Sequence, residues 1–412
     1  MEDHRTMVPG QALPSGFGLT MMQPEFRADP HAVMHRLLTE APVYPDRQFD
    51  QVYVARYDDG RAVLSDRSLA RDPRNARRGS LMRQMLGADS PDYQPTMLVM
   101  DDPDHKRLRG LVSKAFNQRS VDAWRPRIRA VAEQLLDAMA GKPRFDIIQA
   151  YARPLPVTVI AEMLGVDTAH RDDFIRWSEA LIYVFTPIRT PEQEEALAWA
   201  GMALDVFFEA AIDARRGARG DDLISSLVAA EEDGERLSES EIIGTCNLLL
   251  LAGNLTTTDL IGNGVLALLR HPDQLALLRS HPELAANMVE ETLRFEPPVT
   301  NTSRVPREAR EIGGVMVEPG QPLSVFLLAA GRDPAANPEP DRFEIRRPDP
   351  RHLSFGGGAH FCLGAPLARA EGEIAIPLLF ERFPGLHLDP GQPVRRKDTH
   401  LFNGLQSLWL RT

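Results

Sequence analysis

The sequence predicts a mainly α-helical fold with a minor β part. Hydrophobic residues recur with helical spacing through most of residues 103–297 and again in 360–385. Short alternating segments, typical of strands, gather at about 45–65, 300–330 and 386–412. Strands and helices do not alternate regularly along the chain, so the pattern does not support a doubly wound parallel sheet.

The composition is that of a soluble globular protein. Of the 412 residues, 43% are hydrophobic and 25% are charged. The formal net charge of −11 argues against nucleic acid or an anionic membrane as a main partner. No apolar run approaches the ~20 residues of a membrane-spanning helix, and the first residues do not resemble a secretion signal. The two cysteines, Cys246 and Cys362, lie far apart, so we expect a cytoplasmic protein.

The first elements in chain order are a short helix and a hairpin. The helix is predicted over residues 30–40, after a Pro-rich opening. The following stretch, QVYVARYDDGRAVLSD, alternates around the pair Asp59-Gly60. Because Asp-Gly favours a tight turn between two strands, we expect a hairpin here, within the β part at 45–65.

The long helical region is divided by glycines and prolines. Its longest helix spans about 240–270 and ends where Pro272 prevents continuation. Another helix spans about 282–295 and ends before Pro297. Earlier helix breaks are predicted at 141–143, Gly165, 186–187 and 217–220.

The last quarter of the chain combines short strands, a Pro-rich stretch and one helix. Strands are predicted within 304–317 and 321–328, with turns at Gly313-Gly314 and Pro319-Gly320. An irregular stretch and a Gly-rich loop follow. A last helix covers about 365–383, and short strands complete the chain.

Cys362 lies in this Gly-rich loop, directly before the last helix. Glycines let the backbone adopt positive φ and pass close to a flat group, and they leave amides free to point at the sulfur. A thiolate is favoured by such donors and by the positive end of a helix dipole. The spacing Phe–Gly–x–Gly–x–His–x–Cys–x–Gly is matched in full by Phe355, Gly356, Gly358, His360, Cys362 and Gly364.

With this motif the chain resembles the cytochrome P450 family in its soluble bacterial form. The resemblance covers nearly the whole chain. It implies a single domain over residues 1–412, with haem b between the long distal helix and the cysteine-loop helix. It implies that Cys362 is the axial thiolate ligand of the haem iron, donating electron density that favours O–O cleavage. Phe355 then shields this thiolate, and amides near Gly364 tune the redox potential.

A charged pair on one helix also matches the family. Glu291 and Arg294 stand three apart in the segment EETLR, close enough to pair on one helix face. The resemblance implies a third partner, Arg342, in the irregular stretch. Because a buried ion pair adds little net stability, the expected role of the three is to hold the cysteine loop in register.

Four basic residues match the family positions that bind the haem propionates. His105 and Arg109 are four apart and so share a helix face. Arg304 and His360 match the other two positions. Two propionate carboxylates require cationic partners with several donors, which this set of four residues supplies.

The centre of the long helix departs from the family pattern at one position. The resemblance implies that Ala252 and Gly253 open space beside the iron, and that the Thr256 hydroxyl faces the oxygen-binding side. The family position directly before this threonine is an acid that connects the site to solvent protons, and here it is Leu255. Leucine carries no proton, so the efficiency of proton delivery does not follow from the family.

Three interpretations of Leu255 remain open. The chain is a monooxygenase with slowed proton delivery, modified natively or artificially at this position. Alternatively, Asn254, Thr257 or Asp259 substitutes for the acid, Asp259 lying one turn on. In the third interpretation hydrogen peroxide supplies the oxygen already reduced.

The resemblance implies a hydrophobic small-molecule substrate and external electron donors. The two cysteines are too few to ligate an iron–sulfur cluster, so NAD(P)H electrons are expected through a ferredoxin reductase and a ferredoxin. Candidate docking cations are Arg107, Lys114 and Arg369. Substrate-facing candidates, which form a mostly apolar set, are Leu98, Leu181, Phe185, Leu249, Val299 and Phe402.

The predicted function is therefore a haem-thiolate monooxygenase that hydroxylates a hydrophobic molecule with O₂ and two electrons. Because of Leu255, two alternatives stay open: a peroxide-driven enzyme, and a haem binder of low or no turnover. The basic segments at 71–78 and 106–129 are either solvated faces or a patch for an acidic protein.

Overall fold

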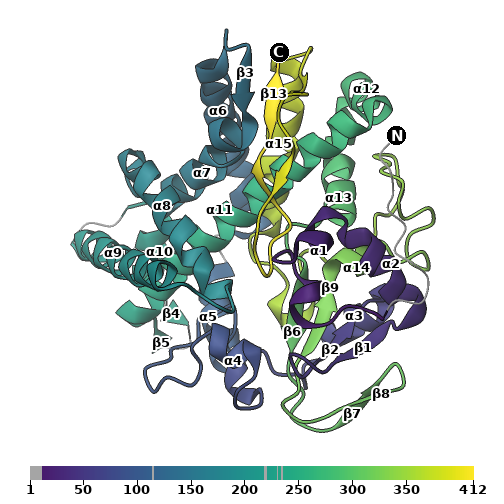
Figure 1. Cartoon of the computed structure of the whole chain (residues 1–412). Coiled ribbons are helices and arrows are strands. Elements are labelled where there is room, and N and C mark those ends of the chain that lie inside the picture. The colour runs from purple at the N-terminus through teal and green to yellow at the C-terminus, as the bar shows by residue number, and fades with distance from the viewer. Residues whose placement is uncertain (1–11, 114–115, 218–219, 230, 233–234) are drawn as a thin grey trace.

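Helix α11 (Glu239–Arg270) crosses the middle of the molecule, and the other elements surround it (Figure 1). The computed structural model describes residues 12–113, 116–217, 220–229, 231–232 and 235–412. Helices α6 to α10 lie on one side of α11, and the largest sheet lies on the other with the N-terminal helices (Figure 1). The mainly helical prediction is confirmed.

The helices account for most of the described chain. Besides α11 they are α1 (Pro24–Ala28), α2 (Pro30–Glu40), α3 (Tyr57–Ser65), α4 (Leu81–Met85), α5 (Asp104–Ser113), α6 (Gln118–Met139), α7 (Pro154–Leu164), α8 (Arg171–Leu181), α9 (Pro191–Arg216), α10 (Leu223–Ala229), α12 (Pro272–Ser280), α13 (Ala285–Phe295), α14 (Leu327–Gly331) and α15 (Ala365–Arg382).

The strands are short. They are β1 (Val43–Asp46), β2 (Gln51–Val54), β3 (Arg144–Asp146), β4 (Glu231–Glu232), β5 (Glu235–Arg236), β6 (Asn301–Arg304), β7 (Arg310–Ile312), β8 (Val315–Val317), β9 (Leu323–Phe326), β10 (His387–Leu388), β11 (Arg395–Arg396), β12 (Leu405–Ser407) and β13 (Trp409–Arg411).

The largest sheet has the order β1-β2-β9-β6. Strand β9 pairs parallel with β2 and antiparallel with β6, so it joins the N-terminal hairpin to the strand that carries Arg304. Smaller sheets are β10-β13-β3, β11-β12, β4-β5 and β7-β8. The main hydrophobic core packs the helices around α11, and two smaller cores cover the largest sheet.

Helix α11 has sequence-encoded ends. The Ser238 hydroxyl accepts a hydrogen bond from the backbone amide of Glu241, whose side chain accepts one from the Ser238 amide. This capping box satisfies two amides that a helix start leaves without partners. At the other end Pro272 begins α12, so the helix that crosses the site has the predicted extent.

Three predictions about elements need correction. Residues 57–65 form helix α3, not the second strand of a hairpin. The acidic Asp58 and Asp59 lie in its first turn, where the helix dipole favours them. A Cβ at Gly60 would lie 2.7 Å from Val325, so the glycine lets α3 pack closely on β9. Helix α12 was not predicted, and the strand predicted over 321–328 ends where α14 begins.

Within the residues that the structure describes, no helix is both long enough and apolar enough to cross a bilayer.

Candidate functional site

The cysteine loop folds back on itself beside α3. The Cys362 amide donates a hydrogen bond to the Phe355 carbonyl, at 2.8 Å. Gly356 and Gly358 have φ values of +70° and +65°, a region that other residues rarely adopt. A Cβ at Gly358 would also lie 2.6 Å from the Leu64 carbonyl oxygen of α3. The positive φ therefore favours glycine at both positions, and close packing also requires it at Gly358.

Donors and cations surround the sulfur of Cys362, which is accessible in the structure. Burial by the surrounding protein raises the pKa of the thiol. The backbone amides of Gly364 and Ala365 and the charges of Arg109 and Arg369 act against this rise without cancelling it, because each stabilises the thiolate. The predicted amide donors are thus present at the start of α15, and an anionic ligand atom suits this environment.

The four predicted propionate partners come from three separate parts of the chain and converge. The rings of His105, on α5, and His360 have centroids 4.0 Å apart. Arg304, at the end of β6, donates to the Gly357 and Leu64 carbonyls, at 3.2 Å each. Arg109 donates to the Phe361 carbonyl, at 2.5 Å. Burial and the charges of the neighbouring basic residues lower the pKa of His360 to about 2.

Arg71 is a further cation in this cluster, and the sequence pattern did not assign it there. Its guanidinium donates to the Ser303 carbonyl, at 3.0 Å, beside Arg304. Burial lowers the pKa of Arg71 to about 10. Arg71 also contributes, with burial, to lowering the pKa of Arg304 to about 9. The signal in the sequence was the basic run 71–78, which was interpreted only as a surface feature.

This cluster fits the two carboxylates of a haem. Like charges held together in a partly buried site are unfavourable unless anions neutralise them. The Nε2 atom of His105 is buried and has no hydrogen-bond partner among the described residues. Carboxylate oxygens would satisfy such a donor. Together with the accessible thiol and its glycine loop, these residues fit an iron porphyrin with two propionates.

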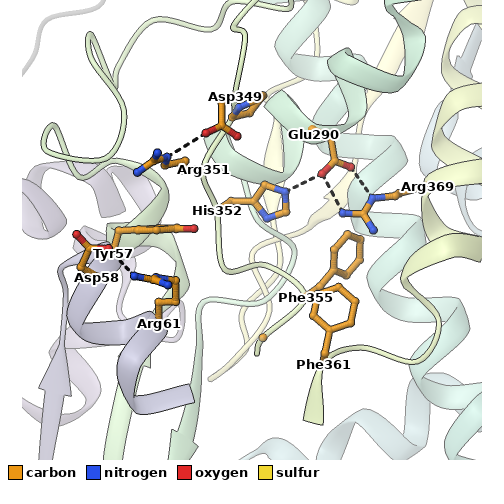
Figure 2. A pocket seen from close by; sticks show the side chains of 12 residues that line it. Tyr57, Asp58, Arg61, Glu290, Asp349, Arg351, His352, Phe355, Phe361 and Arg369 are labelled. Carbon is orange, nitrogen blue, oxygen red and sulfur yellow. Dashed lines mark hydrogen bonds and ion pairs between the residues drawn. The ribbon is translucent and has the colours of Figure 1, made fainter. Parts of the chain in front are cut away.

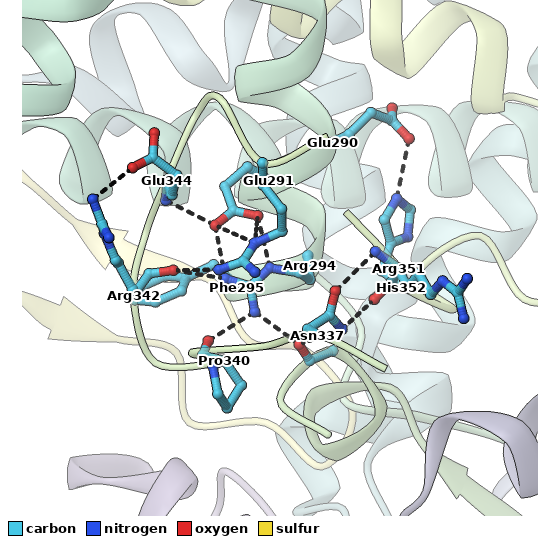
Figure 3. Close-up of polar contacts among 12 residues, drawn as sticks. Glu290, Glu291, Arg294, Phe295, Asn337, Pro340, Arg342, Glu344, Arg351 and His352 are labelled. Atoms are coloured by element: carbon cyan, nitrogen blue, oxygen red, sulfur yellow. Dashed lines mark hydrogen bonds and ion pairs between the residues drawn. The ribbon is translucent and has the colours of Figure 1, made fainter. Parts of the chain in front are cut away.

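Glu291 and Arg294 form a fully buried ion pair on α13 (Figure 3). The Arg294 guanidinium donates to both Glu291 oxygens, at 2.7 Å each. It also donates to the carbonyls of Gly331, Pro340 and Arg342, at 2.8, 2.8 and 3.0 Å. The pair therefore fastens the irregular chain that leads to the cysteine loop.

The side chain of Arg342 is not the third member of this pair, so that prediction is wrong. It points to Glu344, at 2.9 Å, and only its backbone carbonyl contacts Arg294 (Figure 3). Arg347 takes the predicted place, with its Nε 3.2 Å from Glu291 Oε2. Both arginines lie in the irregular stretch, where sequence spacing does not determine which side chain turns inward.

On α11, Thr256 donates its hydroxyl hydrogen to the Ala252 carbonyl, at 2.8 Å, which leaves its oxygen as an acceptor. Ala252 is exposed. A Cβ at Gly253 would lie 3.6 Å from Ile160 of α7, an ordinary contact, so this glycine is not sterically required there. Leu255, at the position of the family's acid, is buried.

The candidate substitutes for that acid have different surroundings. Asp259 is buried and lies 2.6 Å from the ammonium of Lys397. Asn254 is buried and accepts a hydrogen bond from the Thr258 hydroxyl, at 3.4 Å. Thr257 hydrogen-bonds Glu371, a buried carboxyl on α15 that the sequence reasoning missed.

Burial raises the pKa of two carboxyls in this region, Asp259 and Glu371, and Glu371 holds its proton at neutral pH. Burial raises the pKa of Glu371 to about 8, against the smaller lowering effect of the Thr257 hydroxyl. Its Oε1 atom has no hydrogen-bond partner among the described residues. Thr257 follows Thr256 directly, so a protonated carboxyl is linked to the part of α11 that matches the family's oxygen side.

Three of the six substrate-facing candidates lie together. The rings of Phe185 and Phe402 meet edge to face with centroids 5.6 Å apart. Val299 and Phe402 form an isolated antiparallel bridge. Leu181 and Leu249 pack with the main helical core. Leu98 is 38% exposed, and its carbonyl accepts a hydrogen bond from Arg71.

Two of the three predicted docking cations, Arg107 and Arg369, form ion pairs within the chain. The Arg107 guanidinium forms an ion pair with Glu241. Arg369 pairs with Glu290, at 2.6 Å, beside a cavity of about 490 Å³ that borders the cysteine loop at Phe355 and Phe361 (Figure 2). Lys114 lies outside the described residues.

Comparison with known proteins agrees with this geometry. The cytochrome P450 family model matches residues 50–407. The chain is 43% identical to cytochrome P450 107B1 of Saccharopolyspora erythraea, over 88% of this chain and 89% of that protein. It is 40% identical to cytochrome P450 monooxygenase PikC of Streptomyces venezuelae, over 99% and 97%. The solved structure of the Bacillus subtilis bacillaene polyketide synthase cytochrome P450 PksS superposes with a TM-score of 0.86, at 36% identity and coverage of 95% and 98%.

Proposed function

The chain belongs to the cytochrome P450 family and is an oxidoreductase of the monooxygenase class, and we propose that it hydroxylates a hydrophobic small molecule with O₂. The two electrons come from NAD(P)H through a ferredoxin reductase and a ferredoxin. A reducing compartment such as the cytoplasm suits a chain whose two cysteines are both free.

The environment of Cys362 carries this proposal. Two backbone amides and two guanidinium groups favour the thiolate, as an axial ligand requires. Cys362 would hold the haem iron, and His105, Arg109, Arg304 and His360, joined by Arg71, would bind the propionates. The bound haem would supply the site at which O₂ is activated. The Glu291–Arg294 pair with Arg347 holds the cysteine loop in place for this ligation.

The residues of α11 and α15 supply a hydroxyl acceptor and a proton. Thr256 keeps its oxygen free to accept a hydrogen bond, because its own hydrogen is donated to Ala252. Glu371 holds a proton at its carboxyl and contacts the Thr257 hydroxyl one residue further along. This arrangement supports the interpretation in which another group substitutes for the acid that Leu255 replaces. Asp259 is less suited, because the Lys397 ammonium occupies its carboxyl group, although burial raises the pKa of Asp259 too.

The aromatic contact between Phe185 and Phe402, bordered by Val299, supports an apolar substrate. The relatives do not identify that substrate. A screen of hydrophobic ligands for the low-to-high spin shift of the haem spectrum would narrow its class.

The haem-thiolate assignment is tested with purified protein and the variant Cys362→Ser. We expect the intact protein to give a thiolate-type ferrous–CO spectrum and to form product with NAD(P)H, ferredoxin and reductase. Cys362→Ser should lose this spectrum. An identical spectrum in the variant would exclude Cys362 as the ligand.

A peroxide-driven reaction is the second candidate, and buried Leu255 at the acid position favours it. Peroxide brings oxygen that is already reduced, so this reaction depends less on a proton relay. Product from hydrogen peroxide alone, with none from the reductase and ferredoxin system, would establish it. Product from neither oxidant, with the haem spectrum intact, would identify a non-catalytic haem binder.

A further inference from the structure

A polar network borders the cysteine loop at Phe355 and Phe361 (Figure 2). Glu290, on α13, accepts two hydrogen bonds from the Arg369 guanidinium of α15, at 2.6 and 2.9 Å. Its Oε2 atom also lies 3.1 Å from His352 Nε2. Neither side chain of the ion pair is more than about a third exposed, so this is a partly buried, bidentate contact.

The hydrogen bonds determine the tautomer of His352. The Ser354 amide donates to His352 Nδ1, at 3.2 Å, so Nδ1 carries no proton. The hydrogen is therefore on Nε2, which donates it to Glu290. Arg369 is the guanidinium cation that Glu290 neutralises. The Ser354 hydroxyl adds a bond to the Leu293 carbonyl, at 2.6 Å, so the first residues of the loop are fastened to α13.

Arg369 connects this network to the thiolate. Its guanidinium lies over the Phe355 ring, 4.6 Å from the centroid (Figure 2). The Phe355 carbonyl accepts the hydrogen bond from the Cys362 amide. The charge of Arg369 also interacts with the Cys362 sulfur through space. The chain of contacts thus runs from His352 through Glu290 and Arg369 to the ligand residue.

Glu290 keeps its charge in this setting. Burial raises the pKa of Glu290, but hydrogen bonds from His352 and Arg369 outweigh it and lower the pKa to about 2. In turn the hydrogen bond to Glu290 raises the pKa of Arg369. Both charges therefore persist across the working pH range, and the negative charge of Glu290 is paired with the positive charge of Arg369.

We propose that Glu290 and Arg369 are positioning residues for the Cys362 thiolate. Glu290 holds the Arg369 guanidinium over Phe355 and sets how much of its positive charge acts on the sulfur. The inference rests on the proposed haem-thiolate function and deepens it. It also assigns Arg369 a role different from the docking role expected from the sequence.

The test is the midpoint potential of the haem, measured by spectroelectrochemistry on purified holoprotein with chemical mediators and no ferredoxin. Reduction adds negative charge beside the thiolate, so removing a nearby negative charge should favour it and removing a positive charge should oppose it. Glu290→Gln should raise the potential, and Arg369→Met should lower it. The double variant should lie between them. We expect several-fold changes in the ferrous-to-ferric ratio at fixed potential, where tenfold corresponds to about 59 mV.

A matched control exists on the same helix. Arg382, at the end of α15, pairs with Asp137 of α6 at 2.6 Å, and both side chains are exposed. Arg382→Met and Asp137→Asn should leave the potential unchanged. Arg369→Lys retains the charge but not the planar fork, so its potential should lie closer to the original than that of Arg369→Met.

Opposite shifts in the two single variants would support electrostatic control, because a general loosening of the loop would shift both the same way. Shifts of the same sign, or potentials like those of the controls, would overturn the proposal. A lower ferredoxin affinity of Arg369→Met at unchanged potential would restore the docking role instead. Absence of a thiolate-type ferrous–CO spectrum in the unmodified protein would overturn the proposed function itself.

Discussion

The Lys397 ammonium lies 2.6 Å from the Asp259 carboxylate and joins the C-terminal segment to the central helix α11. Asp259 is fully buried and the Lys397 side chain is 13% exposed. The Lys397 amide donates to the Gly404 carbonyl, which closes a loop around Phe402. This ion pair therefore holds in place the loop that carries Phe402, the residue that contacts Phe185 and Val299.

Removing only the cation of this pair should destabilise the protein. Lys397→Met leaves Asp259 buried without a partner, so we expect the free energy of unfolding to fall by about 3 kcal/mol. The double variant with Asp259→Asn should recover most of this loss, because the uncompensated charge is gone. Urea denaturation measures both. A single variant as stable as the unmodified protein would show that the pair does not anchor the segment.

An acidic residue at position 255 should increase the fraction of NAD(P)H electrons that is recovered as product. Leu255→Glu is expected to raise the fraction of NAD(P)H electrons recovered as product, because a titratable group then lies beside Thr256. Leu255→Ile is the matched control, since it keeps the site apolar. The measurement compares NAD(P)H consumed with product formed. An unchanged ratio in Leu255→Glu would count against defective proton delivery.

Glu371 should make stability depend on pH. The folded protein holds the Glu371 proton up to a pKa of about 8, whereas the ordinary value is 4.5. Between these values the folded state binds more protons than the unfolded state, so the free energy of unfolding falls as pH rises. This contribution is complete below the ordinary pKa and is lost above the raised one.

The variant Glu371→Gln should therefore reduce the slope of stability against pH in this window, by up to about 1.4 kcal/mol per pH unit. Unfolding in urea at several pH values measures the slope. If the variant and the original give the same slope, Glu371 ionises normally in the folded protein. If the Thr257–Glu371 contact supplies protons, the same variant should also lower the fraction of NAD(P)H electrons that is recovered as product.

Of the two arginines in the irregular stretch, Arg347 should contribute more than Arg342 to stability and haem retention. Arg347→Met removes a donor from the fully buried Glu291, so we expect a loss of about 2 kcal/mol in the free energy of unfolding and weaker retention of haem. Arg342→Met removes an exposed contact to Glu344 and should change stability by less than about 0.5 kcal/mol. Thermal unfolding and haem content compare the two. The reverse order would restore Arg342 as the third partner.

Local chemistry made several parts of this structure predictable. Pro272 cannot continue a helix, so the end of α11 followed from one residue. Gly356 and Gly358 adopt positive φ, and their spacing with His360 and Cys362 predicted the loop. The hairpin predicted at Asp59-Gly60 was wrong, because the same residues suit both a hairpin turn and the first turn of a helix. Here packing of Gly60 against Val325 decided for the helix.

The sequence alone determined the family, the ligand candidate Cys362 and the convergence expected of His105, Arg109, Arg304 and His360, because each depends on residue type and spacing. Only the tertiary structure decided that Arg347 reaches Glu291 and that Arg71 turns inward. It also decided that Arg369 is held by Glu290, and that a protonated Glu371 meets Thr257. These contacts join residues distant in the chain, and their geometry and burial, which set charge and proton affinity, arise only when the segments pack together.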